Sequence, residues 1–254
     1  LMKEFGRVAS IEYRSLGIAT ALSPQIDLAS DPRWGRFEGT MGEDPNLVTD
    51  LARSYVDGFQ STNTKGWGVN SVNTMIKHWP GGGTGEGGRD GHYGFGSYAV
   101  YPGDNIEEQM KIFTEGALNL RGNTLSASAI MPYYTIALGN GEGVGSAYNN
   151  YLINNILRDK YQYDGVLCTD WGITGDAFAV DVFFSGKSFG VENLTVAERH
   201  YKALMSGMDQ FGGNNDMIPV LEAFKIGVEE YGEDFMRNRF EKSAVRLLKN
   251  IVNV

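Results

Sequence analysis

A carboxylate beside a large aromatic ring is the strongest candidate for chemistry in this chain. Asp170 and Trp171 follow a short apolar run, Val166–Cys168, with Gly165 before it and Gly172 after Trp171. Such a run is typical of a fully buried parallel strand, and residues just past the carboxyl end of a strand face the ligand site in α/β folds. There the ring can stack on a pyranose face while the carboxylate meets an electron-poor carbon, which favours sugar chemistry. The alternative is an Asp that only caps the following turn.

A lysine and a histidine stand side by side at the end of another expected strand. Lys77 and His78 come just before Trp79, Pro80 and Gly81. Neighbouring side chains on a strand point to opposite faces, so both can line one pocket only where the strand ends and bends, as Pro80 and Gly81 favour. The pair indicates ligand contact; the alternative is a solvated lysine.

A third candidate is Arg36, which ends the loop segment Asp31–Arg36. A guanidinium there offers a fork of donors to hydroxyls or carboxylates. The alternative is a loop in which the arginines pair with nearby acids, and this is the interpretation we favour for Arg33. For Arg36 both interpretations stay open.

Cofactor motifs are weak. Residues Gly83–Gly88 match G-x-G-x-x-G, but no helix opens there to hold a pyrophosphate, and Gly186–Ser188 lacks the first glycine of a phosphate-binding loop because residue 181 is Asp. The three histidines, His78, His92 and His200, have no zinc-like spacing. We therefore expect no cofactor and no metal.

Composition limits the partners and the class of protein. The 254 residues are 42% hydrophobic, which is enough for a core, and the formal net charge of -9 argues against nucleic acid or an anionic membrane as partner. No apolar run of the length of a membrane span occurs, and no signal peptide is visible. The single cysteine, Cys168, lies inside an apolar strand, so we expect it to be buried and inert.

Strand-like and helix-like patterns alternate along the chain, which predicts an α/β fold with a parallel sheet. The expected strands cover 18–28, 69–79, 124–131, 166–169 and 208–211. The expected helices cover 2–16, 45–59, 104–120, 146–158, 195–206, 216–231 and 233–252. Asp44 is the expected N-cap of the second helix, whose apolar stripe is Leu47, Leu51, Tyr55 and Phe59. A closed barrel needs eight strands, so we expect either further strands upstream or an open sheet.

Several ordered motifs resemble those of family 3 of the glycoside hydrolases, and within it the bacterial β-glucosidases. The motifs cover Asp31–Arg36, Gly42–Pro45, Lys77–Gly81 and Thr169–Gly172, with further likeness in Ala129–Tyr134, Ser206–Asp209 and Ala244–Leu248. The resemblance implies one (β/α)8 TIM-barrel-like catalytic domain over residues 1–254, with its first strands missing and the α/β domain that follows in the family absent.

The resemblance also implies retaining hydrolysis of terminal β-linked glucose, or a similar sugar, from the non-reducing end of an oligosaccharide or glucoside. Asp170 matches the nucleophile and Trp171 the aromatic wall of the first subsite. The residues matching those that bind the sugar are Arg36, Lys77, His78, Met131 and Tyr134.

Two departures and three alternatives stay open. No Asp before Arg36 matches the family's early sugar-binding loop, and the general acid/base of the β-glucosidases is expected outside this chain. The alternatives are a β-xylosidase; a β-N-acetylglucosaminidase, in which Asp90 and His92 resemble the acid of a variant branch although Gly91 replaces its Ser or Thr; and a non-catalytic sugar-binding protein. A nucleotide-binding domain would rest on the weak glycine loop alone. The oligomeric state stays open, and a periplasmic or secreted location fits an enzyme of plant glycans.

Overall fold

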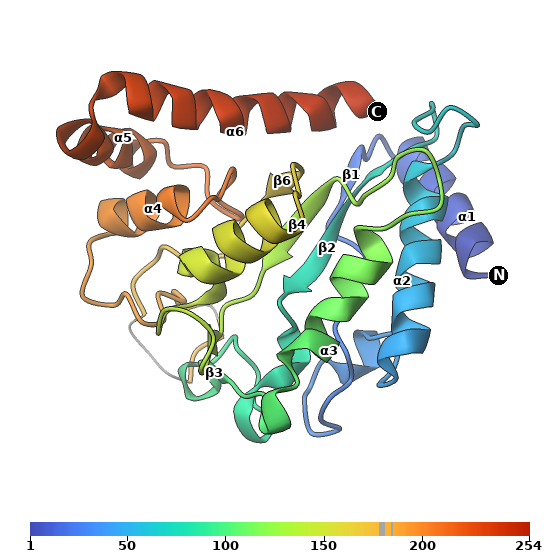
Figure 1. Ribbon diagram of the computed structural model, residues 1–254, viewed down its shortest axis with the longest axis horizontal. Coiled ribbons are helices and arrows are strands. Elements are labelled where there is room, and N and C mark those ends of the chain that lie inside the picture. The colour runs from blue at the N-terminus through green and yellow to red at the C-terminus, as the bar shows by residue number, and fades with distance from the viewer. Residues whose placement is uncertain (178–180, 184) are drawn as a thin grey trace. The chain divides into compact units, whose positions relative to one another are not determined.

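The computed structural model describes residues 1–177, 181–183 and 185–254. Its contacts divide the chain into two compact units. Unit 1 comprises 1–84, 101–131 and 248–254, and unit 2 comprises 85–100 and 132–247. Figure 1 shows the course of the chain through the elements of both units.

Unit 1 is built on parallel strands. Strand β1 (Thr20–Ala21) pairs in parallel with β2 (Asn73–Trp79), and β4 (Ala129–Pro132) is the next neighbour of β2. The expected strand 18–28 is shorter than predicted, because Pro24 has no N–H to donate to a ladder. Pairing resumes after it as a single parallel bridge between Gln25 and Lys77.

One helix of unit 1 begins at the capping residue that the sequence predicts. Helix α2 (Pro45–Gln60) starts after Asp44, whose carboxylate accepts a hydrogen bond from the Leu47 N–H at 2.8 Å. Helix α1 (Met2–Ser15) packs closely on α2, since a Cβ on Gly58 would lie 2.2 Å from the Lys3 carbonyl oxygen. Helix α3 (Ile106–Lys111) continues into the wider turns of η6 (Ile112–Ala117).

The predicted apolar stripe of α2 is wrong in part. Leu47 is 54% exposed, and the hydrophobic residues that α2 buries are Val48, Ala52, Val56 and Phe59. Helix α2 contacts α1 and η6 as well as β2. Its buried surface is therefore wider than one stripe four residues apart, and it is rotated away from Leu47.

Unit 2 contains short strands and the remaining helices. Strand β3 (Tyr98–Ala99) pairs in parallel with β5 (Ile136–Ala137), and β6 (Val166–Leu167) is followed by a parallel bridge between Cys168 and Gln210. The helices are η8 (Tyr151–Lys160), α4 (Val196–Met205), α5 (Ile218–Tyr231) and α6 (Glu233–Asn253), whose last residues belong to unit 1. The single-turn helices of unit 2 are η3 (Glu86–Gly88), η4 (Gly94–Gly96) and η7 (Ser146–Tyr148), and those of unit 1 are η1 (Phe37–Gly39), η2 (Gly82–Thr84) and η5 (Pro102–Asp104).

A buried carboxylate ties β6 to the helices of unit 2. Asp209 is fully buried and accepts hydrogen bonds from the Leu167 N–H (3.0 Å), from Arg158 (2.8 Å) and from Arg246 (3.1 Å). Arg239 is a further cation, 3.8 Å away. A buried charge is tolerated only when it is paired and hydrogen-bonded, so this cluster fixes the position of β6 relative to η8 and α6 within unit 2.

The predicted α/β fold with a parallel sheet is confirmed, and closure into a barrel stays a prediction. Within the described residues, no helix combines the length and apolar character that a membrane crossing requires.

Replacing Asp209 tests the role of this cluster. We expect Asp209→Asn to lower the free energy of unfolding by about 3–5 kcal/mol, because the buried guanidinium groups lose their counter-charge. The matched control is Asp164→Asn, which removes the mostly exposed partner of Arg246 and should cost about 1 kcal/mol or less. Urea denaturation measures both, and equal losses would contradict the assignment.

Candidate active site

The predicted site residues fall in both units. Unit 1 holds Arg36, Lys77, His78 and Met131, and unit 2 holds Tyr134, Asp170 and Trp171. Within unit 1 the structure brings Arg36 and His78 together. That all of these residues form one pocket stays a prediction.

His78 is held by a carboxylate that the sequence analysis missed. Asp27 is completely buried and accepts three hydrogen bonds, from the His78 backbone N–H (2.8 Å), the His78 Nδ1 (2.7 Å) and the Gly82 N–H (2.6 Å). Burial raises the pKa of Asp27, but the imidazole and the backbone N–H groups outweigh burial and hold that pKa below its ordinary value. The available signal was a charged residue placed between Ile26 and Leu28 in an expected strand.

The two arginines of the loop behave differently. Arg33 forms an ion pair with Asp31 at 2.6 Å and lowers the pKa of that carboxyl to about 2, as the pairing interpretation predicted. Arg36 points elsewhere: its Nη2 donates to Gln25 Oε1 (3.1 Å), and its Nη1 lies 3.4 Å from His78 Nε2. Arg36 therefore lies beside His78, another predicted ligand-binding residue at the end of β2. This contact favours the ligand-contact interpretation of Arg36.

The remaining predicted residues of unit 1 lie on the strands themselves. Lys77 is partly exposed on β2, whereas His78 beside it is buried. Met131 is buried in β4.

In unit 2, Asp170 follows β6 at the predicted place. The preceding Thr169 donates its N–H to the Gln210 carbonyl at 2.9 Å, and Cys168 is buried as expected. Asp170 is 6% exposed, and its Oδ1 accepts a hydrogen bond from the Trp171 N–H at 2.7 Å. The carboxylate is thus fixed at the end of the strand, while the Trp171 side chain is 41% exposed.

Two glycines allow the Trp171 indole to lie against the backbone. A Cβ at Gly212 would lie 2.7 Å from Trp171 Cε3, and one at Gly213 would lie 2.3 Å from Cδ1. Gly213 also has a φ of 66°, which favours glycine. The Gly212 N–H donates to Thr169 Oγ1 at 2.9 Å. The backbone at Gly212 and Gly213 therefore forms the surface on which this aromatic wall rests.

Unit 2 also places an Asp–His pair next to Tyr134. His92 Nδ1 lies 2.6 Å from Asp90 Oδ1. The His92 ring stacks on Phe183 with centroids 4.3 Å apart and meets Tyr134 edge-on at 4.9 Å. A carboxylate on one imidazole nitrogen orients the ring and fixes which nitrogen it binds, which leaves the other nitrogen for proton transfer.

Lys187 is a second group that the sequence analysis did not assign to the site. The side chain is 3% exposed and donates to the carbonyl oxygens of Phe183 and Ser185. Burial lowers the pKa of Lys187, and the charges of Asp170 and Asp90 oppose that shift. The sequence analysis considered Lys187 only as part of Gly186–Ser188, which does not match a phosphate-binding loop. A loop lysine gives no local sign that it is buried near carboxylates.

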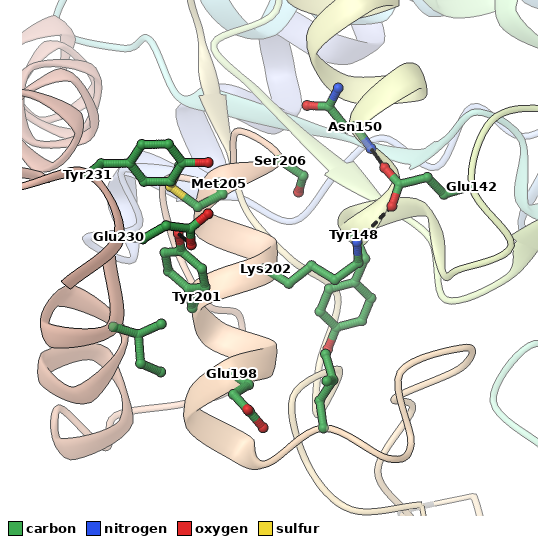
Figure 2. A pocket seen from close by; sticks show the side chains of 12 residues that line it. Glu142, Tyr148, Asn150, Glu198, Tyr201, Lys202, Met205, Ser206, Glu230 and Tyr231 are labelled. Carbon is green, nitrogen blue, oxygen red and sulfur yellow. Dashed lines mark hydrogen bonds and ion pairs between the residues drawn. The ribbon is translucent and has the colours of Figure 1, made fainter. Parts of the chain in front are cut away.

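A separate pocket of about 450 Å³ lies in unit 2 and contains none of the predicted site residues. Its acids already have partners, as Figure 2 shows: Glu142 is bound by Lys202 at 2.7 Å, and Glu230 lies by Tyr201, whose hydroxyl donates to it at 2.6 Å. This pocket is therefore not the candidate site. Nor do three or more His, Cys, Asp or Glu residues gather as metal ligands in the part of the chain that the structure describes.

Comparison with known proteins decides the family. Residues 1–249 match the model of the glycosyl hydrolase family 3 N terminal domain. The chain belongs to glycoside hydrolase family 3. The resemblance expected from the sequence motifs is thereby confirmed for nearly the whole chain.

Two relatives in family 3 have nearly the same sequence identity to this chain. The chain is 37% identical over 250 residues to β-glucosidase C of Emericella nidulans. It is 38% identical over 265 residues to a periplasmic β-glucosidase/β-xylosidase of Dickeya chrysanthemi. Each match covers 98% of this chain and 38% of the relative's length.

A solved structure shares the family 3 fold. A β-N-acetylglucosaminidase from Paenibacillus aligns with a TM-score of 0.73 at 20% identity, over 99% of this chain and 43% of that one. At this identity the likeness supports the fold alone.

A substitution under the indole tests the Trp171 geometry. We expect Gly213→Ala to displace the Trp171 ring, because the new Cβ would lie 2.3 Å from Cδ1. The matched control is Gly139→Ala, which has a φ of 78° and nothing within 4 Å, so it carries the same backbone strain of about 1–2 kcal/mol without the clash. Fluorescence, read as the difference from Trp171→Phe in each background, should shift only in the Gly213 variant. An unchanged Trp171 signal in that variant would contradict the geometry.

Proposed function

We propose that this chain carries the catalytic nucleophile of a retaining glycoside hydrolase that removes terminal β-linked glucose, or a similar sugar, from the non-reducing end of an oligosaccharide or glucoside. The observation that carries the proposal is Asp170, buried at the end of β6 and adjacent to the exposed indole of Trp171, in a member of family 3. The names of the relatives, β-glucosidase and β-glucosidase/β-xylosidase, support the substrate class.

The mechanism follows from a carboxylate that attacks and a pocket that holds the sugar. Asp170 attacks the anomeric carbon and forms a covalent glycosyl ester as the leaving oxygen departs with a proton. Water then attacks the same carbon from the opposite face and releases the sugar with its configuration retained. Protonation of the leaving oxygen requires a second carboxyl group, which we do not assign.

The other predicted residues bind and orient the glycone. Arg36, Lys77 and His78 supply polar groups for its hydroxyls, and Met131 and Tyr134 line the same subsite. A pocket that admits a C6 hydroxymethyl group selects glucosides, and one that excludes it selects xylosides. A neutral glycoside is also compatible with a net charge of -9, which disfavours nucleic acid.

Chemical rescue tests the proposed nucleophile. We expect Asp170→Ala to lower kcat for a 2,4-dinitrophenyl β-glucoside by at least about a thousandfold, since removal of a nucleophile removes the covalent route. This leaving group departs without acid help, so the test needs no acid from the chain. Added azide should restore turnover and yield an α-glycosyl azide, because it attacks from the vacated face.

The matched control for this test is Asp50→Ala, which removes a mostly exposed carboxylate on α2 that pairs with Arg53. Its activity should equal that of the wild type. Full activity of the Asp170 variant, or a β-configured azide product, would contradict the proposed role.

A second candidate, a β-N-acetylglucosaminidase, is favoured by one observation. The 2.6 Å contact between Asp90 and His92 Nδ1 is the arrangement that an imidazole needs to protonate a leaving oxygen from Nε2. In this alternative His92 is the general acid. Gly91 stands where the variant branch of the family has Ser or Thr.

Leaving-group dependence separates the two candidates. If His92 is the acid, His92→Gln should slow hydrolysis of a 4-methylphenyl β-N-acetylglucosaminide by about a hundredfold or more, because general acid catalysis contributes about 10²–10⁴-fold. It should leave the corresponding dinitrophenyl substrate nearly unaffected. Equal effects on both substrates, or no turnover of either by the wild type, would exclude the second candidate.

A further inference from the structure

Another pocket lies within unit 1, away from the candidate active site. It has a volume of about 400 Å³ and is lined by residues 61–64, by residues 121–123 and by Lys3 on α1. These two segments precede β2 and β4 in the chain, whereas His78 and Met131 lie near the ends of those strands. About 16 Å of extended strand separates Asn73 from His78. The pocket is therefore distinct from the site at the end of β2.

The lining of this pocket carries positive charge and hydrogen-bond donors. Lys3 and Arg121 are its cations, and none of the described residues that line it is Asp or Glu. The chain as a whole has a net charge of -9, so this local excess of positive charge departs from the average of the surface. Ammonium and guanidinium groups donate hydrogen bonds and do not accept them. Such a lining matches an anion better than a neutral ligand.

Neither cation is fully engaged by the protein. Arg121 is exposed and makes no hydrogen bond or ion pair with any residue that the structure describes. The Lys3 ammonium lies 3.7 Å from Asp57 Oδ2, which is longer than a hydrogen bond. The Asp57 side chain is 3% exposed, and its Oδ1 accepts a hydrogen bond from the Gly122 N–H at 2.9 Å. One buried carboxylate thus faces two cations and balances only part of their charge.

The two loops that line the pocket are tied to each other. Asn123 Nδ2 donates to the Thr64 carbonyl oxygen at 2.7 Å. Asn63 Oδ1 accepts a hydrogen bond from the Lys65 N–H at 2.9 Å, which fixes the amide and leaves its NH₂ group for another partner. Donors that are already held in place lose little freedom when a ligand binds, and this favours affinity.

We propose that this pocket binds a tetrahedral oxyanion, namely a phosphate group that is either free or the monoester of a small molecule. Donors come from three segments, with Lys3 on α1, Asn63 in the first loop and Arg121 in the second. A tetrahedral group presents oxygens in several directions, whereas a carboxylate presents two in one plane. The guanidinium supplies a fork for two of these oxygens, and the ammonium supplies a point charge.

The size of the pocket allows more than the ion itself. A volume of about 400 Å³ lies within the range of small-molecule sites, so an organic group can accompany the phosphate. The site is built from unit 1 alone and does not rest on the proposed glycosidase activity.

Titration of the full chain with inorganic phosphate tests the site. At constant ionic strength we expect the backbone amide NMR signals of residues 61–64 and 121–123 to shift saturably, with a Kd in the millimolar range or below. Binding should weaken as the salt concentration rises, because salt screens exposed charges.

Removal of the unpaired guanidinium tests its role. We expect Arg121→Gln to raise the Kd for phosphate about tenfold or more, since hydrogen bonds to charged groups are among the strong ones. The matched control is Arg14→Gln, which removes one positive charge from the last turn of α1, outside the pocket. Its Kd should equal that of the wild type.

Three outcomes would overturn the proposal: no saturable shift of these signals, equal weakening in the two arginine variants, or acetate binding as tightly as phosphate. Methyl phosphate distinguishes the two sources of the group. Tighter binding of methyl phosphate than of inorganic phosphate supports a monoester as the ligand, and weaker binding supports the free ion. Because each readout is binding, failure of the glycosidase proposal would leave this test unaffected.

Discussion

The candidate sugar site in unit 1 depends on one buried charge. Asp27 has no exposure to solvent, so its carboxylate persists only because three N–H groups, two from the backbone and one from His78, point at it. These bonds connect the end of β2 with the turn at Gly82 and fix the imidazole. Arg36 in turn takes its place between His78 and Gln25. A loop arginine and a strand histidine thereby become a rigid pair.

In unit 2 a buried, hydrogen-bonded carboxylate has the same role. The carboxylate of Asp209 balances the positive charge of several guanidinium groups and holds β6 in place. The backbone bridge between Cys168 and Gln210 then positions Asp170. The glycines at 212 and 213 leave room for the Trp171 ring. In both units the groups proposed to meet the substrate are placed by buried, hydrogen-bonded neighbours. Catalysis requires such preorganisation, because small displacements of the reacting groups are costly.

Local signals predicted much of the fold and part of the site. The helix expected from residue 195 is confirmed, and in the structure Thr195 and Glu198 form a capping box at its start. Asp44 marks a helix start that the structure also confirms, because capping is decided within a few residues. The position of Asp170 at a strand end was predicted for the same reason. Asp27 and Lys187 were not predicted, since their roles arise from burial against segments distant in the sequence. Strand lengths were overestimated, because hydrophobic patterns do not reveal where ladder pairing stops.

The central claim is that Asp170 forms a covalent bond with a sugar, and trapping the intermediate tests it most directly. The protein is incubated with 2,4-dinitrophenyl 2-deoxy-2-fluoro-β-glucoside, and intact mass is followed by peptide mapping, with Asp170→Asn as control. The account predicts one fluoroglucosyl group per chain on the peptide that contains Asp170, and none in the variant. An adduct on another residue, or no adduct at all, would contradict the account, and the absence of any adduct would favour a sugar-binding protein without this chemistry.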